Sequence, residues 1–190
     1  MKLKNLIIVM FLFMSYIAVA QKDITKETIS TAMFQVTYAY QFPGADTKIL
    51  YGNNSSIGAS FMYKTNKNWF LAANGNFIFG DNINASREDI LGIILDHNGE
   101  LITGDGIYAS YAMFERGYHI QARVGKIINV LAPNPNCGFF VNVGLGYLTN
   151  RVRIEFSSHA SPPPNLAGDY RYGYDRMRGG FVYSGEIGYL

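Results

Sequence analysis

The chain has 190 residues and a formal net charge of +2, from 16 basic and 14 acidic residues. That near balance lacks the basic surplus that binding to nucleic acid requires, so we expect no nucleic-acid partner. The single cysteine, Cys137, excludes an intramolecular disulfide framework. The length fits one domain. Aromatic residues at 15%, 20 glycines and only 16% charged residues favour strands with an aromatic-rich exterior.

The N-terminus has the three parts of a secretory signal peptide. Two lysines precede an apolar run from Leu6 to Val19, which is shorter than the roughly 20 residues of a membrane helix. Ala18-Val19-Ala20 is a small-x-small cleavage site. We therefore expect a signal peptide over 1–20 with cleavage after Ala20, a short N-terminal segment over 21–30 and one domain over 31–190.

Eight segments of that domain alternate between apolar and polar residues with a period of two, as strands do. In one of them Tyr118, Ile120 and Val124 alternate with Gln121 and Arg123. Several apolar faces carry aromatic residues near their ends, as interfacial girdles in a membrane do. The eight segments cover residues 32–42, 56–64, 68–80, 106–115, 117–127, 137–148, 150–156 and 179–190.

Short and long connections alternate between these segments. We interpret 65–68, 115–117 and 148–150 as tight turns, and the longer connections as 43–54, 80–105, 128–136 and 158–178. This alternation is typical of an outer-membrane barrel with short periplasmic turns and long extracellular loops, and a Greek-key sandwich has no reason to show it. Segments of about 9–11 residues have the length that a tilted strand needs to cross a bilayer. The sequence therefore predicts an all-β fold, an antiparallel up-and-down transmembrane β-barrel of about eight strands.

In such a barrel the apolar faces contact lipid and the polar faces line a narrow lumen filled by side chains. Isolated buried arginines are costly, so we expect them to pair with glutamates across the lumen. The predicted lumen-facing polar network consists of Gln35, Asn74, Asn76, His119, Gln121, Arg123, Asn142, Arg151, Arg153, Glu155, Ser184 and Glu186.

Signals for catalysis or metal binding are weak. The histidines are His97, His119 and His159, and no G-x-S-x-G nucleophile elbow occurs. Residues 95–106 depart from the order of an EF-hand loop, and Asn98-Gly99 inside them reads as a hairpin turn. We expect no catalytic residue, metal or cofactor.

Two long connections have features of their own. Over residues 85–95 Ser86 as N-cap and Asp89 three residues later predict a short helix, whose apolar face would form a lid over the barrel mouth or a docking face. Residues 157–178 contain three consecutive prolines, which stiffen the chain, followed by tyrosines and arginines. These either pack over the mouth or bind a protein or glycan. The binding candidates are Tyr170, Arg171, Tyr172, Tyr174 and Arg176.

Two long stretches, "NPNCGFFVNVGLGYLTNRVRIE" and "GDYRYGYDRMRGGFVYSGEIGYL", resemble a family of uncharacterised outer-membrane β-barrel proteins from Bacteroidota. The likeness is carried by Asn134-Pro135-Asn136, Gly144-Leu145-Gly146-Tyr147 and Gly173-Tyr174-Asp175-Arg176. It implies a fold and a location in the bacterial outer membrane, and no reaction. Leu190 falls inside an apparent strand, so a barrel of eight strands and a truncated piece of a larger barrel both stay open.

The leading functional hypothesis is a non-enzymatic scaffold or binding role through the long extracellular loops. The expected partners are outer-membrane lipid and an envelope protein. A small-solute channel or carrier and an outer-membrane acyl hydrolase are the alternatives.

Overall fold

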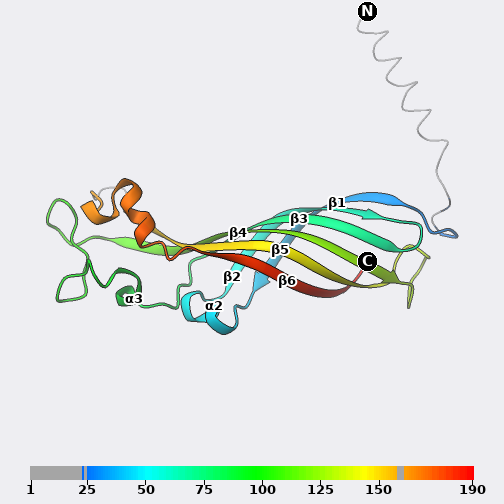
Figure 1. Cartoon of the computed structure of the whole chain (residues 1–190), viewed down its shortest axis with the longest axis horizontal. Coiled ribbons are helices and arrows are strands. Elements are labelled where there is room, and N and C mark those ends of the chain that lie inside the picture. The colour runs from blue at the N-terminus through cyan, green and yellow to red at the C-terminus, as the bar shows by residue number, and fades with distance from the viewer. Residues whose placement is uncertain (1–22, 24, 158–160) are drawn as a thin grey trace, which may run out of the picture.

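The computed structural model describes residues 23, 25–157 and 161–190, so the predicted signal peptide lies outside the described residues. Six antiparallel strands form one sheet in which each strand pairs with its neighbour in sequence (Figure 1). The strands are β1 Thr31–Gln41, β2 Asn54–Lys64, β3 Trp69–Gly80, β4 Tyr111–Ile128, β5 Phe139–Phe156 and β6 Arg178–Tyr189. The fold is therefore all-β and up-and-down, as the sequence predicts.

The number of strands differs from the predicted eight. Two pairs of predicted segments are single long strands, because the predicted turns at 115–117 and 148–150 are strand residues, which pair across β4 and β5 with 150–152 and 117–119, respectively. Gly117 lies opposite Asn150, and a Cβ on Gly117 would overlap the Asn150 side chain. The glycine thus serves close packing between β4 and β5 and not a turn. The sheet is also not closed into a barrel, since among the described strands β1 and β6 each have one neighbour.

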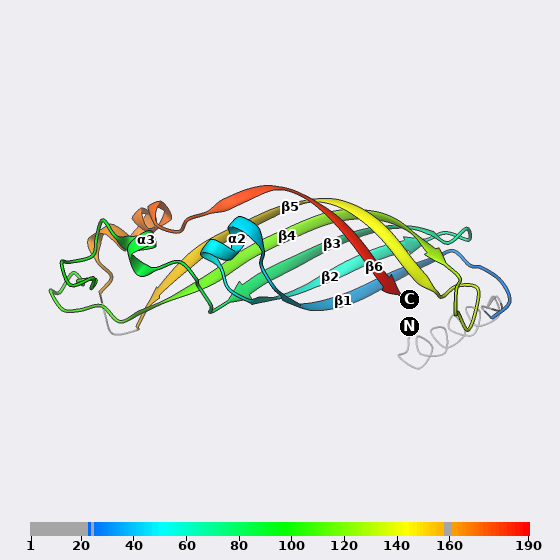
Figure 2. The same ribbon diagram turned by 90° about the horizontal axis from the view of Figure 1, so that it is seen from below.

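Long and short connections still alternate. Residues 65–68 and 129–138 join strands at one end, while 42–53, 81–110 and the described residues between β5 and β6, 157 and 161–177, lie at the other end (Figure 2). The long connections hold the short helices α2 Ala45–Leu50, α3 Arg87–Leu91, η2 Pro164–Leu166 and η3 Gly168–Gly173. No helix in the described part of the chain combines the length and the apolar character of a membrane span.

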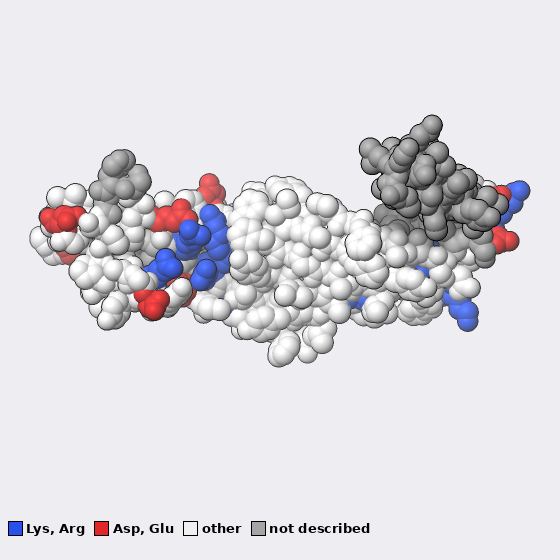
Figure 3. Space-filling model, turned by 90° about the horizontal axis from the view of Figure 1, so that it is seen from above, with Lys and Arg blue, Asp and Glu red and all other residues white. Residues whose placement is uncertain are grey.

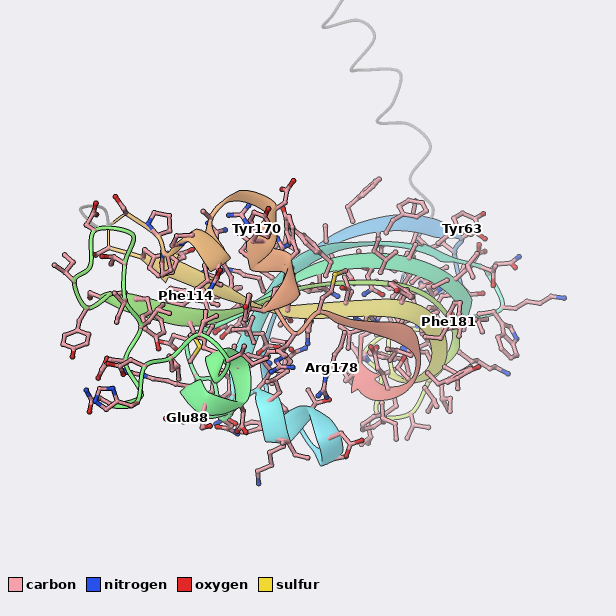
Figure 4. All side chains as sticks on the ribbon, turned by 60° about the vertical axis from the view of Figure 1, so that its left-hand side comes forward. Tyr63, Glu88, Phe114, Tyr170, Arg178 and Phe181 are labelled. Atoms are coloured by element: carbon pink, nitrogen blue, oxygen red, sulfur yellow. The ribbon has the colours of Figure 1, made fainter. Side chains whose placement is uncertain are left out.

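The two faces of the sheet differ sharply in composition. We call the face that carries Tyr118 and Ile120 the outer face, and the face that carries Gln121 and Arg123 the inner face. In the middle of every strand the outer face carries exposed apolar side chains, up to 84% exposed for Val36 and 82% for Tyr183. Tyr63 and Phe181, labelled in Figure 4, belong to this exposed set. Buried polar side chains lie on the inner face, for example Gln121, which is 3% exposed.

Charge is absent from the middle of the outer face. Along β4 the outer face carries Arg116 and Lys126 with only Tyr118, Ile120, Ala122 and Val124 between them. Lys126 follows Arg116 by ten residue steps along the strand. At about 3.4 Å per residue and a tilt of about 40°, they mark a band about 26 Å high, close to the apolar belt of a membrane barrel. Figure 3 shows the same uncharged middle, with Lys and Arg side chains beside it on the loop side.

β4 and β5 continue past their neighbours as a two-stranded ribbon, made of residues 111–114 and 151–156. A hydrophobic core forms around it from Leu50, Tyr51, Ile90, Leu91, Leu101, Ala109, Val152 and Leu166. We call the structure built by α2, residues 81–110 and residues 161–177 the loop cap.

The predicted helix over 85–95 is confirmed as α3. Its capping box is complete, since the Ser86 hydroxyl accepts a hydrogen bond from the Asp89 amide and the Asp89 carboxylate accepts one from the Ser86 amide. Ile90 and Leu91 are 2% and 0% exposed within the loop cap. The helix therefore packs its apolar face internally and does not offer it to a partner.

At the opposite end, residues before β1 are fastened to the connection between β4 and β5. The Ile29 amide donates a hydrogen bond to the Asn136 side chain at 2.8 Å, and the Lys64 ammonium donates to the Ile29 carbonyl at 3.1 Å and to Asn136 at 2.9 Å. A small apolar cluster of Met62, Phe70, Ala72 and Ile127 lies nearby on the inner face. This end is thus held by hydrogen bonds as well as by apolar packing.

Candidate functional site

Polar residues form rows across the inner face, because residues directly opposite each other on neighbouring antiparallel strands point to the same side of the sheet. One row runs from Gln35 through Ser60 and Asn74 to Gln121, across β1, β2, β3 and β4. The next row contains Arg123 and Ser184, with Gly144 between them. The register therefore gathers polar side chains from all six strands on one surface.

Arg123 is the centre of this inner-face network. Its guanidinium is paired with Glu186 on β6, and a second nitrogen donates to the Ser60 hydroxyl on β2 at 3.3 Å. The Asn142 side-chain amide donates to the same Glu186 carboxylate at 3.0 Å. Because Arg123 lies on β4 and reaches both β2 and β6, the sheet must curl around it. The expected pairing of an inward arginine with an inward glutamate is present.

Gly144 makes this reach geometrically feasible. A Cβ at this position would lie 2.5 Å from Nε2 of Gln121, 2.8 Å from the Ser184 hydroxyl and 2.9 Å from Cγ of Arg123. The absence of a side chain on β5 therefore lets Gln121 and Arg123 cross to β6, where Gln121 donates to Ser184.

The histidine and serine of the inner face are not joined as a catalytic pair. Ser184 is bonded to Gln121, while His119 lies in the row of Asn76, which accepts a hydrogen bond from Thr37 at 3.0 Å. His119 Nε2 is buried and has no hydrogen-bond partner among the described residues. A nucleophile needs a base within hydrogen-bond reach, so nothing in this arrangement favours the acyl hydrolase. His159 lies outside the described residues.

Three residues of the predicted network lie on the other face. Arg151, Arg153 and Glu155 continue the outer-face side of β5, in line with Leu145 and Tyr147, because β5 runs through 150 without a turn. Arg153 is paired with Glu155 at 2.7 Å, and both side chains are exposed. The remaining members, from Gln35 to Glu186, lie on the inner face.

A second buried polar cluster, which the sequence pattern does not predict, lies where the sheet meets the loop cap. Glu115 is 0% exposed and accepts a hydrogen bond from the Asn54 side chain at 2.8 Å. Burial raises the pKa of the Glu115 carboxyl and outweighs the opposite effect of that hydrogen bond. Burial, reinforced by the nearby Glu115 charge, also raises the pKa of Tyr51. The sequence predicts a turn that begins at Glu115, and so it does not indicate a buried position for this residue.

This cluster holds a carboxylate without a cation. No basic group of the described residues forms an ion pair with Glu115, and its second oxygen has no hydrogen-bond partner there. Arg178 lies farther along, in a cavity of about 220 Å³ that Tyr51 and Asn150 also line. Figure 4 shows Arg178 on the side of the sheet that faces α2. A buried acid in this setting is stabilised in its neutral form.

The loop binding candidates divide into two groups. Tyr170 is 76% and Tyr172 50% exposed, and the Arg171 guanidinium carbon lies over the Tyr172 ring, 5.3 Å from its centroid. Tyr174 packs against the core of the loop cap, and the Arg176 guanidinium donates to the Asp89 carbonyl. Tyr170 therefore lies exposed on the side of the ribbon opposite α3 (Figure 4), whereas Tyr174 is half-buried and Arg176, although exposed, is held against α3 by its hydrogen bond.

The described residues offer no obvious place for a metal ion, since no group of three His, Cys, Asp or Glu side chains gathers among them. The predicted hairpin turn in residues 95–106 is confirmed, with Leu95 bridged to Leu101 and Gly99 at φ 77°. Asp96 there accepts hydrogen bonds from the backbone amides of Asn98 and Glu100. Its carboxylate thus holds the turn together.

Comparison of the chain with protein-family models, with curated proteins and with solved structures found no match.

Proposed function

We propose that this protein is an integral outer-membrane β-barrel protein that serves as a non-enzymatic scaffold or binding protein through its loop cap. The observation that carries the proposal is the orientation of the sheet. Apolar side chains of all six strands are exposed on the outer face, while polar side chains are buried on the inner face. In water this is the reverse of a stable arrangement, and in lipid it is the favoured one.

The height of the uncharged band supports the same conclusion. Arg116 and Lys126 bound about 26 Å of apolar surface, and Lys126 lies over the Trp69 ring at 5.5 Å. An aromatic ring next to a cation at the limit of the band is typical of a membrane–water interface. The predicted signal peptide agrees with export to that location.

A lipid location requires that the two open edges be covered. Lipid offers no hydrogen-bond partners, so the unpaired backbone groups along β1 and β6 would each cost several kcal/mol there. β1 and β6 run in opposite directions within the sheet, so additional strands can continue the antiparallel pattern from either edge. In the membrane we therefore expect β1 and β6 to be paired with further strands.

The loop cap supports the binding role. It has its own hydrophobic core and is anchored on the β4–β5 ribbon, so it holds a defined shape above the sheet. It exposes Tyr170, Tyr172 and Ile93, the last at 94%. Exposed aromatic side chains on a rigid support are typical of protein–protein binding sites.

Three measurements test this proposal. We expect the full chain to co-sediment with outer membranes and to migrate faster on a gel when unheated than when boiled, as folded barrels do. Recovery in the soluble fraction without heat-dependent mobility would refute the membrane location. Liposome swelling separates the scaffold from a channel, because clear solute flux through the inserted protein would contradict a purely structural role.

A further inference from the structure

Two arginines face each other across the outer face at the loop-side limit of the apolar band. Arg116 on β4 and Arg151 on β5 are direct partners in the register. Like charges placed opposite each other in an antiparallel pair destabilise it. Within the part of the chain that the structure describes, no carboxylate lies at ion-pair distance from either guanidinium. An anion from outside the protein would relieve this repulsion.

Cavities flank the pair on both sides. Arg116 lines one of about 420 Å³ with Tyr40, Phe79 and Phe114. Arg151 lines another of about 310 Å³ with Arg153, Arg171 and Tyr172. Each cavity includes one acid, Asp81 in the first and Asp175 in the second. Asp175 already accepts a hydrogen bond from the Met177 amide at 3.0 Å. The cations and aromatic rings of both cavities thus adjoin the apolar band.

The ends of these side chains leave donors available for a ligand. One guanidinium nitrogen of Arg116 donates to the Glu115 carbonyl at 2.7 Å, and its guanidinium carbon lies 4.9 Å from the Phe114 ring centre. These contacts orient Arg116 without neutralising it. Arg171 belongs to η3 and lines the same cavity as Arg151. Arginine forks match the oxygen geometry of phosphate and form two hydrogen bonds at once.

We propose that Arg116, Arg151 and Arg171 form a binding site for the phosphate groups of anionic membrane lipids. The position selects a lipid over a soluble phosphate, because acyl chains of a bound lipid would lie along the apolar band directly beside the arginines. Figure 3 shows this junction, where Lys and Arg side chains begin at the border of the uncharged surface. This inference rests on the proposed membrane location and adds the class of lipid that the protein holds.

The test uses the full chain inserted into phosphatidylcholine vesicles that contain a minority of phosphatidylglycerol. After extraction into mild detergent, the phosphatidylglycerol retained per protein is measured by mass spectrometry. We expect enrichment over the bulk lipid for the wild type. Arg116→Gln with Arg151→Gln should weaken retention about tenfold, the effect of losing charge-assisted hydrogen bonds. Arg116→Lys with Arg151→Lys should retain part of it, because the charges remain.

Lys126→Gln is the matched control, since it removes a cation from the other limit of the same band. Its retention should stay within about twofold of the wild type. The lipid site is overturned if Lys126→Gln loses as much phosphatidylglycerol as the double arginine variant does. It is also overturned if the wild type retains phosphatidylglycerol only in the proportion present in the vesicles. In both cases heat-modifiable mobility would still support the membrane location. If inorganic phosphate binds as tightly as the lipid does, the proposal that the natural ligand is a lipid is overturned. Failure of the wild type to insert overturns both proposals.

Discussion

A charge placed in the middle of the outer face distinguishes lipid from water as the surrounding medium. Leu145 lies midway along the apolar run of β5, is 51% exposed and pairs with Ala122 on β4. In a bilayer an arginine at the midplane costs about 2–4 kcal/mol, falling to about 0–1 kcal/mol near the interface. In water a substitution at such an exposed position changes stability by only about 0.5 kcal/mol in either direction.

Leu145→Arg is therefore expected to lower the free energy of unfolding in vesicles by about 3 kcal/mol, and Ala122→Arg at the same level to act similarly. Phe139→Arg, near the turn end of β5, is the shallow control and should cost about 1 kcal/mol or less. The assay is urea unfolding in phospholipid vesicles, monitored by fluorescence of Trp69, the single tryptophan. Equal costs at the deep and shallow positions, or costs below about 0.5 kcal/mol at both, would refute the reasoning.

The remaining predictions concern the inner face and its border with the loop cap. Glu186→Gln should cost about 3 kcal/mol because it leaves Arg123, whose side chain is 13% exposed, as a buried unpaired cation. Arg123→Gln should cost less, about 1–2 kcal/mol, because the Glu186 side chain that it leaves unpaired is 38% exposed. A lower urea midpoint for Arg123→Gln than for Glu186→Gln would contradict the view that Arg123 is the more deeply buried charge. Gly144→Val should destabilise by about 1–3 kcal/mol in the same assay by overpacking, whereas Gly185→Val, with open space at its Cβ position, should be close to neutral. Burial raises the pKa of Glu115, so stability should fall as the pH rises above the unfolded value of about 4.3, and Glu115→Gln should abolish that fall between pH 4 and 8. An unchanged pH profile in the variant would locate the titrating group elsewhere.

The sequence predicted the face of each residue better than the number of strands. A period of two depends only on the pleat, so the assignment of Ile120 to the outer face and Gln121 to the inner face follows from local pattern. Strand ends depend on what lies across the sheet. Glu115-Arg116-Gly117 looks like a turn, but the glycine accommodates the Asn150 side chain of the neighbouring strand. No single-strand pattern contains that information.

The errors in the candidate site follow from the same cause. Because two predicted segments form the single strand β5, Arg151 and Arg153 stay on the same face as Leu145. A turn at 148–150 would have allowed them to lie on the opposite face. The interior position of Glu115 also depends on the merged β4. By contrast, the Arg123–Glu186 pair was accessible to prediction, because both residues fall on the polar side of clearly alternating segments. The helix at 85–95 was predictable because a capping box is a local motif.

The open edges of the sheet determine how the chain is expected to behave in water. β1 and β6 present unsatisfied amides and carbonyls beside rows of exposed aromatic and branched residues, including Phe34 and Ile187. Such borders act as templates on which identical chains add in water, and repeated addition yields fibrils. If the protein is exported to the outer membrane as we propose, we expect its transit through water to require a partner that shields both edges, and a delay before insertion to favour aggregation over assembly.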